Sequence, residues 1–210
     1  MQENQLREHI ALIGKSLYDR GLAHGSAGNI SVKLADGWLM TPTNSCLGRL
    51  DPARISRLDA SGKLVSGDKP SKETFLHIAM YEERAGCGAV VHLHSVHAVA
   101  VSCMDGLDAA NVFPPITAYA IMQVGALALV PYFPPGDESL ADAVRAVAGR
   151  HQAVLLANHG PVVAGSTLDA AVNAIEELEQ TARLVLLLQG HPVRHLSVEQ
   201  IAELNRRFAG

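Results

Sequence analysis

The sequence AVVHLH at residues 89–94 ends in two histidines that are one residue apart. The apolar run before them predicts a buried β-strand, and successive side chains of a strand point to opposite faces. His92 and His94 are therefore expected to leave the same face, at a separation that a single metal ion can bridge. This stretch predicts half of a metal site.

A second apolar strand is predicted over residues 153–157, and it leads directly into NHGP at residues 158–161. His159 thus follows a strand exit beside turn-forming residues and is the expected third ligand. Three neutral imidazoles favour Zn²⁺, and a catalytic zinc keeps a further position for water, substrate or a labile carboxylate. Glu73 is the candidate carboxylate, although a glutamate in the first turn of a helix is also commonplace because the helix dipole favours an anion.

Composition and charge favour a cytoplasmic enzyme with one domain over residues 1–210. Hydrophobic residues make up 48% of the chain and aromatic residues 4%, so the core is built mainly from aliphatic side chains. A net charge of -4 without a basic cluster argues against nucleic acid as a partner. The three cysteines form no CxxC pair, which favours free thiols in a reducing compartment. The polar N-terminus predicts no signal peptide, and the longest aliphatic run, residues 184–188, is too short to span a membrane.

Strand and helix patterns are mixed along the chain without a regular βαβ repeat. This mixture predicts a mixed sheet flanked by helices, with no linker that divides it. We expect strands over residues 30–34, 37–40 and 64–65 besides the two histidine strands, and helices over residues 6–17, from Ser71, over 138–148, over 168–189 and after Ser197.

Three polar segments are candidates for binding a phosphate group. Their residues are Ser26, Gly28 and Asn29; Thr43 and Asn44; and Ser71 and Lys72. Backbone N–H groups and hydroxyls can bind a phosphate without fixed cations, and a helix start with a lysine is the better anion site. The same residue types also dominate ordinary turns and caps, so each segment alone is weak evidence.

Taken in order, these segments resemble the class II aldolase/adducin family, which includes fuculose phosphate aldolase and ribulose phosphate 4-epimerase. The motifs are SAGNIS at residues 26–31, TPT at 41–43, PSKE at 70–73, HLHSVH at 92–97 and NHG at 158–160. The resemblance covers nearly the whole chain. It implies a three-layer α/β/α sandwich around a mostly antiparallel sheet, and a homotetramer with active sites at subunit interfaces.

The resemblance also implies roles for individual residues. It implies zinc bound by the histidines His92, His94 and His159. It further implies that Glu73 ligates the resting metal and then acts as the acid/base. The phosphate pocket of the family corresponds to Ser26, Gly28, Asn29, Thr43, Asn44 and Ser71. Tyr119 matches an interface tyrosine that assists proton transfer in the aldolases, and a half-buried core tyrosine is the alternative interpretation.

Two departures from the aldolases indicate a branch of the family. The aldolases have Thr-Gly where this chain has Thr43-Asn44, and Ser-Ser-Glu where it has Ser71-Lys72-Glu73. A lysine at this position adds a positive charge that suits a substrate with a second anion, such as a carboxylate. These segments look most like the branch that decarboxylates 3-oxo-tetronate 4-phosphates.

The expected chemistry follows from the same residues. A Zn²⁺ ion on three imidazoles can stabilise an enediolate as a Lewis acid, and loss of CO₂ from a 3-oxo acid leaves that anion. A proton from Glu73 then gives dihydroxyacetone phosphate. The expected substrate is a phosphorylated sugar acid of four-carbon sugar acid catabolism. The alternatives are an aldolase, epimerase or dehydratase on another sugar phosphate, a non-catalytic assembly module like the adducin head, and a plain metal-binding protein.

Overall fold

A computed structural model describes residues 2–134 and 136–208 of the chain. Its strands are β1 (Asn29–Leu34), β2 (Gly37–Met40), β3 (Ser56–Asp59), β4 (Leu64–Ser66), β5 (Ala89–His92), β6 (Leu127–Val130), β7 (Ala153–Leu156) and β8 (Gly160–Gly165). Its helices are α1 (Glu3–Asp19), α2 (Thr74–Glu83), α3 (Val96–Ser102), α4 (Ser139–Ala148), α5 (Leu168–Leu187) and α6 (Val198–Phe208), with short helical turns η1 (Leu47–Arg49), η2 (Pro52–Arg54) and η3 (Ala120–Val124).

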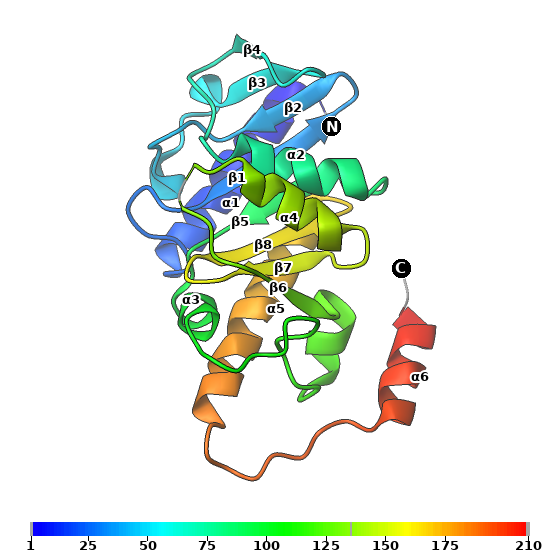
Figure 1. The fold of residues 1–210 in the computed structure, drawn as a ribbon. Coiled ribbons are helices and arrows are strands. Elements are labelled where there is room, and N and C mark those ends of the chain that lie inside the picture. The colour runs from blue at the N-terminus through cyan, green and yellow to red at the C-terminus, as the bar shows by residue number, and fades with distance from the viewer. Residues whose placement is uncertain (1, 135, 209–210) are drawn as a thin grey trace.

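The eight strands form a single sheet in the order β4-β3-β2-β1-β5-β8-β7-β6 (Figure 1). Strands β6 and β7 run parallel, and the other neighbouring pairs are antiparallel. Helix α4 connects β6 to β7. This helical crossover carries the chain back to the level at which β6 starts, so β7 runs parallel to β6. The predicted α/β class is confirmed, and the sheet is mixed, because one parallel pair joins a set of otherwise antiparallel neighbours.

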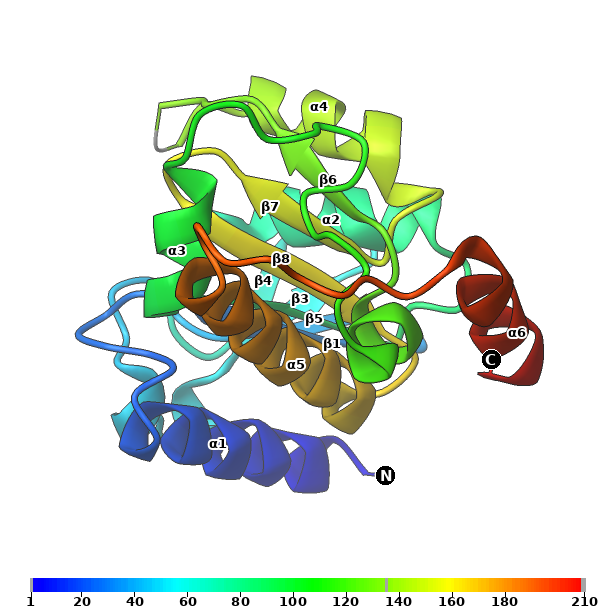
Figure 2. The ribbon, with the colours of Figure 1, turned by 90° about the horizontal axis from the view of Figure 1, so that it is seen from below.

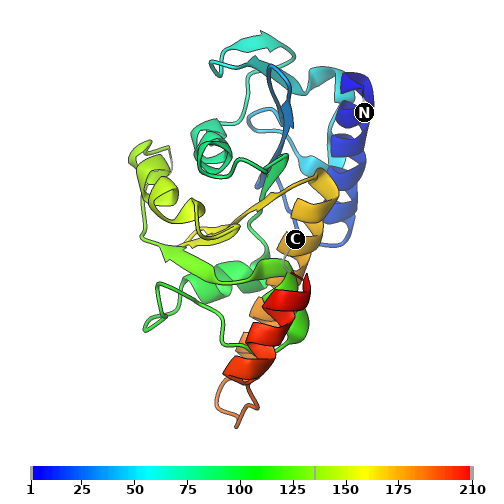
Figure 3. The same ribbon diagram turned by 90° about the vertical axis from the view of Figure 1, so that its right-hand side faces the viewer.

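Helices cover both faces of the sheet (Figures 2 and 3). Helices α1 and α5 pack on one face of the sheet, and α2 and α4 pack on the other. Each face has its own cluster of buried, mainly aliphatic side chains. Strand β5 lies between the two clusters, so Val91 joins the cluster under α5 and Val90 joins the cluster under α2. A strand buried on both faces explains why its sequence is a continuous apolar run.

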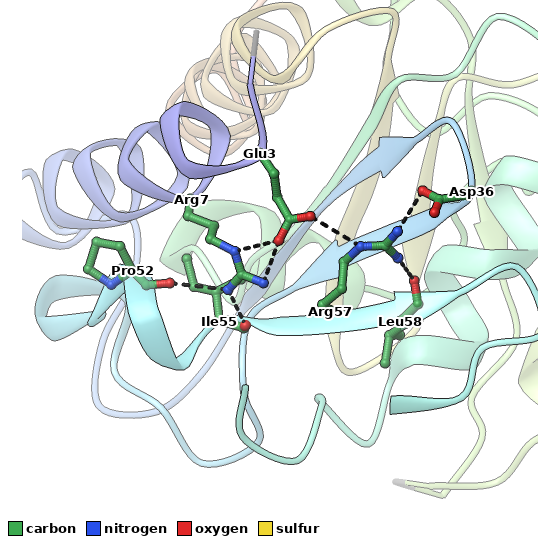
Figure 4. A network of polar contacts seen from close by, with 7 residues as sticks. All are labelled: Glu3, Arg7, Asp36, Pro52, Ile55, Arg57 and Leu58. Atoms are coloured by element: carbon green, nitrogen blue, oxygen red, sulfur yellow. Dashed lines mark hydrogen bonds and ion pairs between the residues drawn. The ribbon is translucent and has the colours of Figure 1, made fainter. Parts of the chain in front are cut away.

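A network of charged side chains fastens α1 to the edge of the sheet (Figure 4). Glu3 accepts a hydrogen bond from Arg7 at 2.9 Å and one from Arg57 at 3.3 Å. Arg7, which is 8% exposed, also donates to the carbonyl oxygen of Ile55 at 2.6 Å. These contacts hold the segment between β2 and β3 against the N-terminal helix.

Several predicted elements have the expected bounds, and others differ. The capping box before α6 is confirmed, because Ser197 N–H donates to Gln200 at 2.8 Å and Gln200 N–H donates to the Ser197 hydroxyl at 3.3 Å. Strands β3, β6 and β8 were not predicted. None of the helices in the described part of the chain combines the length and apolar character needed to cross a membrane.

Candidate metal centre

Three imidazoles and one carboxylate meet at the end of β5. The Nε2 atom of His94 lies 3.0 Å from the Nε2 atoms of both His92 and His159. The carboxylate oxygens of Glu73 lie 3.6 Å from Nε2 of His92 and 3.3 Å from Nε2 of His159. All four ligand atoms lie within 4.8 Å of one another. Zinc with bonds of about 2.0 Å needs ligand atoms roughly 3 to 3.5 Å apart, so one ion fits among these side chains.

The pleat of β5 places His92. Its side chain follows Val90 on the face that packs under α2, and it is fully buried. Because the carbonyl oxygen of Pro161 can only accept, the Nδ1 atom of His92, 2.9 Å away, donates the hydrogen bond. This contact fixes the tautomer in which the Nε2 lone pair faces the other ligands.

The turn between β7 and β8 places His159. Leu156 and Gly160 are paired residues of the β7–β8 hairpin, and Asn158 between them has a left-handed φ of 56°. A Cβ atom at Gly160 would lie 2.5 Å from the carbonyl oxygen of Leu93, which is closer than real Cβ contacts allow. Glycine therefore lets this turn approach the end of β5 and brings His159 beside the other two histidines.

Glu73 was expected in the first turn of a helix. In the structure it is instead the N-cap residue of α2. Its N–H donates to the hydroxyl of Ser71 at 3.2 Å. Its Oε2 atom accepts a hydrogen bond of 2.6 Å from the side-chain amide of Asn29. The carboxylate is therefore held between the end of β1 and the start of α2, with 20% of its side chain exposed.

The electrostatics favour neutral histidines around an ionised carboxylate. Burial lowers the pKa of His92, and burial together with the neighbouring histidines lowers the pKa of His94 to about 3. Burial alone would raise the pKa of Glu73, but His92 and the hydrogen bonds with His159 and Asn29 outweigh it and hold the pKa well below its usual range. Neutral imidazoles and an ionised carboxylate are the forms that bind a divalent cation.

A cavity of about 640 Å³ opens beside these ligands. Its lining includes the candidate ligands Glu73, His94 and His159. The lining also includes the apolar and aromatic residues Val96, Val99, Tyr132 and Phe133. A cavity of this size can hold a small phosphorylated compound.

The predicted phosphate-binding residues do not all lie in one place in the structure. Thr43 N–H donates to the carbonyl oxygen of Lys69 at 2.9 Å, and Ser71 N–H donates to the carbonyl oxygen of Thr41 at 3.1 Å. This pairing brings the second and third predicted segments together. Thr43 and Asn44 also line a cavity of about 280 Å³. Lys72 and Ser26 are exposed.

Gly28 and Asn29 also lie beside the candidate metal ligands. Gly28 has a φ of +85°, and a Cβ atom there would lie 3.0 Å from the carbonyl oxygen of His92. Asn29 is paired with His92 across β1 and β5 and hydrogen-bonds Glu73. The structure thus indicates a contact with the carboxylate that the sequence analysis did not foresee for Asn29.

Tyr119 is not brought to the ligands within one chain. It is 64% exposed and lines a separate cavity that also includes His97 and Glu179. His97 Nδ1 lies 2.8 Å from a carboxylate oxygen of Glu179 and does not belong to the ligand cluster. Tyr119 is therefore not among the residues that line the cavity beside the candidate metal ligands.

His77 was not predicted as a site residue. It is 1% exposed, and its Nε2 atom lies 2.5 Å from Oδ1 of Asn29. The sequence spacing between Glu73 and His77 could have indicated that the two side chains lie close together. His77 follows Glu73 by four residues, which places both side chains on one side of the helix start. A buried histidine among apolar residues gives no indication of its partners without the fold.

Comparisons with known proteins assign the family. Residues 8–186 match the model of the class II aldolase and adducin N-terminal domain. The crystal structure of YgbL from Escherichia coli has a TM-score of 0.94 and 50% sequence identity to this chain, covering 96% of this chain and 98% of that one. The chain therefore belongs to the class II aldolase/adducin family, as its motifs predicted.

Named relatives fall in two groups within this family. The chain is 51% identical over 203 residues to 3-oxo-tetronate 4-phosphate decarboxylase of Escherichia coli K12, covering 96% of each chain. It is 34% identical over 212 residues to L-fuculose phosphate aldolase of the same organism, covering 99% of this chain and 96% of the aldolase. The identity to the decarboxylase is the higher of the two.

Proposed function

We propose that this protein is a zinc-dependent decarboxylase that converts 3-oxo-tetronate 4-phosphate to dihydroxyacetone phosphate and CO₂. The observation that carries the proposal is the cluster of three imidazoles and Glu73 beside an open cavity. Relatives that are 47% to 51% identical over nearly the full length and are named for this reaction support the choice of substrate.

His92, His94 and His159 would hold the ion, with Glu73 as a fourth, labile ligand. A bound Zn²⁺ supplies a Lewis acid that stabilises negative charge on the oxygens of the substrate. The donor set fits this ion because imidazole nitrogens and an ionised carboxylate are ligands that Zn²⁺ takes in catalytic sites.

Glu73 is proposed as the acid that completes the reaction. Loss of CO₂ breaks the bond between C1 and C2 of the substrate and leaves its electron pair at C2. Conversion of the substrate carboxylate to CO₂ consumes one proton, which Glu73 takes up from solvent through the cavity and passes to C2. Asn29 holds Oε2 of Glu73, and Oε1 lies 3.3 Å from Nε2 of His159, so both oxygens are fixed beside the proposed metal ligands.

The reaction itself is directly testable. The purified, zinc-loaded protein should release CO₂ and dihydroxyacetone phosphate in equal amounts from 3-oxo-tetronate 4-phosphate, and each product should be quantified separately. Metal-free protein is the control and should release neither. Cleavage of fuculose phosphate to lactaldehyde, with no CO₂ from the oxo acid, would replace the decarboxylase by the aldolase alternative.

Lys72 is proposed to bind the substrate carboxylate or to share its phosphate. A hydrogen bond to a charged group contributes enough that Lys72→Ser should lower kcat/KM for the oxo acid about 10- to 100-fold. Steady-state kinetics will measure this loss. Lys63→Ser removes an exposed lysine of the β3–β4 turn and should leave kcat/KM unchanged. Equal values for the Lys72→Ser variant and the parent would remove Lys72 from substrate binding.

We also propose that the remaining polar segments bind the phosphate and that the enzyme works as a homotetramer in the cytoplasm. The phosphate residues of this proposal are Ser26, Gly28, Asn29, Thr43, Asn44 and Ser71. Exposed apolar side chains support an interface near the cavity, because Val96 is 63% exposed and Tyr132 is 59% exposed. A neighbouring subunit would then supply Tyr119 to the site.

A further inference from the structure

A chain of buried polar side chains lies behind Glu73. The hydroxyl of Tyr81 lies 2.8 Å from Oγ of Ser31, and the same Oγ lies 2.7 Å from Nδ1 of His77. Nε2 of His77 lies 2.5 Å from Oδ1 of Asn29, and Nδ2 of Asn29 lies 2.6 Å from Oε2 of Glu73. The four residues behind the carboxylate are at most 5% exposed.

The local structure explains how these residues meet. Asn29 and Ser31 are two residues apart on β1, so both side chains point to the same face. His77 and Tyr81 are four residues apart on α2, so both lie on the same side of the helix. Ser31 is paired with Val90, which packs into the cluster under α2. The polar face of β1 therefore meets the polar side of α2 in an otherwise apolar layer.

The charge of Glu73 determines the direction of every hydrogen bond in this chain. An ionised carboxylate can only accept, so Asn29 must donate from Nδ2 and present Oδ1 to His77. Oδ1 can only accept, so the proton of His77 is on Nε2 and its Nδ1 is an acceptor. Ser31 must then donate to Nδ1 and accept from Tyr81. All donors point towards Glu73.

The electrostatics of His77 agree with this assignment. Burial lowers the pKa of His77 to about 3. The ring is therefore neutral at physiological pH and has one donor and one acceptor nitrogen, as the chain requires. Burial also raises the pKa of Tyr81 above its usual value, so its hydroxyl keeps the proton that it donates to Ser31.

We propose that His77 is a positioning residue, which as the Nε2–H tautomer locks the amide of Asn29 so that its NH₂ group holds the Glu73 carboxylate beside the metal ligands. Without the donor of His77, Oδ1 of Asn29 is a buried acceptor with no partner, and the amide loses the contact that fixes its orientation. The effect on turnover rests on the proposed function, whereas the tautomer of His77 does not.

The first arm of the test measures the tautomer and needs no substrate. Nitrogen-15 NMR of histidine-labelled protein should show His77 protonated on Nε2 and unprotonated on Nδ1. Comparison with the His77→Gln spectrum assigns the signal among the 10 histidines of the chain. A proton on Nδ1, or a charged His77 ring at physiological pH, would overturn the proposal.

The second arm measures turnover of the zinc-loaded variants. His77→Leu replaces the imidazole with an apolar side chain of similar size and so removes the hydrogen-bond donor. We expect kcat to fall about 10- to 100-fold, with KM and zinc content unchanged. His77→Gln should recover most of this loss, because its amide N–H can reach the position of Nε2. Met80→Ala also opens the buried side of α2 but removes no hydrogen-bonding group of the chain, so its kcat should stay near that of the parent.

The outcomes separate the two proposals. Parental kcat in His77→Leu, or an equal loss in His77→Leu and His77→Gln, would overturn the positioning role. Absence of turnover in the parent protein itself would refute the proposed function, and the tautomer measured by NMR would then decide the inference about His77.

Discussion

Replacing His94 by alanine should remove the bound metal and abolish turnover together. The Nε2 atom of His94 lies 3.0 Å from the Nε2 atoms of both other histidines, so its loss leaves only two imidazoles and a carboxylate. Metal content by mass spectrometry and the rate of CO₂ release should be measured on the same sample. His94 is partly exposed, whereas His92 is fully buried, so the His94 variant creates the smaller packing defect.

His97→Ala is the matched control for this experiment. His97 belongs to the same HLHSVH segment, but it contacts Glu179 and lies outside the ligand cluster. The control should keep most of its metal. The same loss of metal and turnover is expected for His92→Ala and His159→Ala, and a fully active, metal-loaded His159→Ala protein would refute the assignment of three histidine ligands.

The second large effect is expected at Glu73. Replacement by glutamine keeps the shape of the side chain and all three imidazoles, so zinc stoichiometry should remain near that of the parent protein. The amide cannot deliver a proton, and turnover should therefore fall by about 10²-fold or more. Metal content and kcat measured side by side separate the role of an acid from that of an indispensable ligand.

Glu82→Gln is the control for the Glu73 variant. Glu82 belongs to α2 as well, but its carboxylate is exposed and pairs with Arg145 at 2.7 Å. Turnover of this control should equal that of the parent. Parental turnover in Glu73→Gln would exclude Glu73 from the mechanism, and loss of the metal in that variant would make it a required ligand.

The grouping of the candidate metal ligands could be predicted because each has a local signature. His92 and His94 follow the two-residue period of a buried strand, and His159 follows the exit of another strand. The structure brings them together with Glu73 within 4.8 Å. Strand β8 was missed because its sequence begins with Gly160 and Pro161, which are typical of turns.

The residues behind the ligands could not be predicted for a different reason. Periodicity shows which side chains share a face, but it does not show which helix packs on which strand. Asn29 and His77 are far apart in the sequence and meet only because α2 covers β1. The proposed role of Tyr119 is harder still to predict from the sequence, because it depends on how a second chain packs against this one.

The ligands come from three separate segments, and this has a consequence for the protein in the cell. An ion bound by the end of β5, the β7–β8 turn and the residue before α2 cross-links the middle of the sheet to the helix layer above it. Binding to the folded chain adds to the free energy of unfolding, by about 2.7 kcal/mol when the free metal is at 100 times its dissociation constant. If the proposed ion binds, we expect the amount of folded protein to follow the metal supply of the cell, so that a shortage would reduce both its activity and its lifetime.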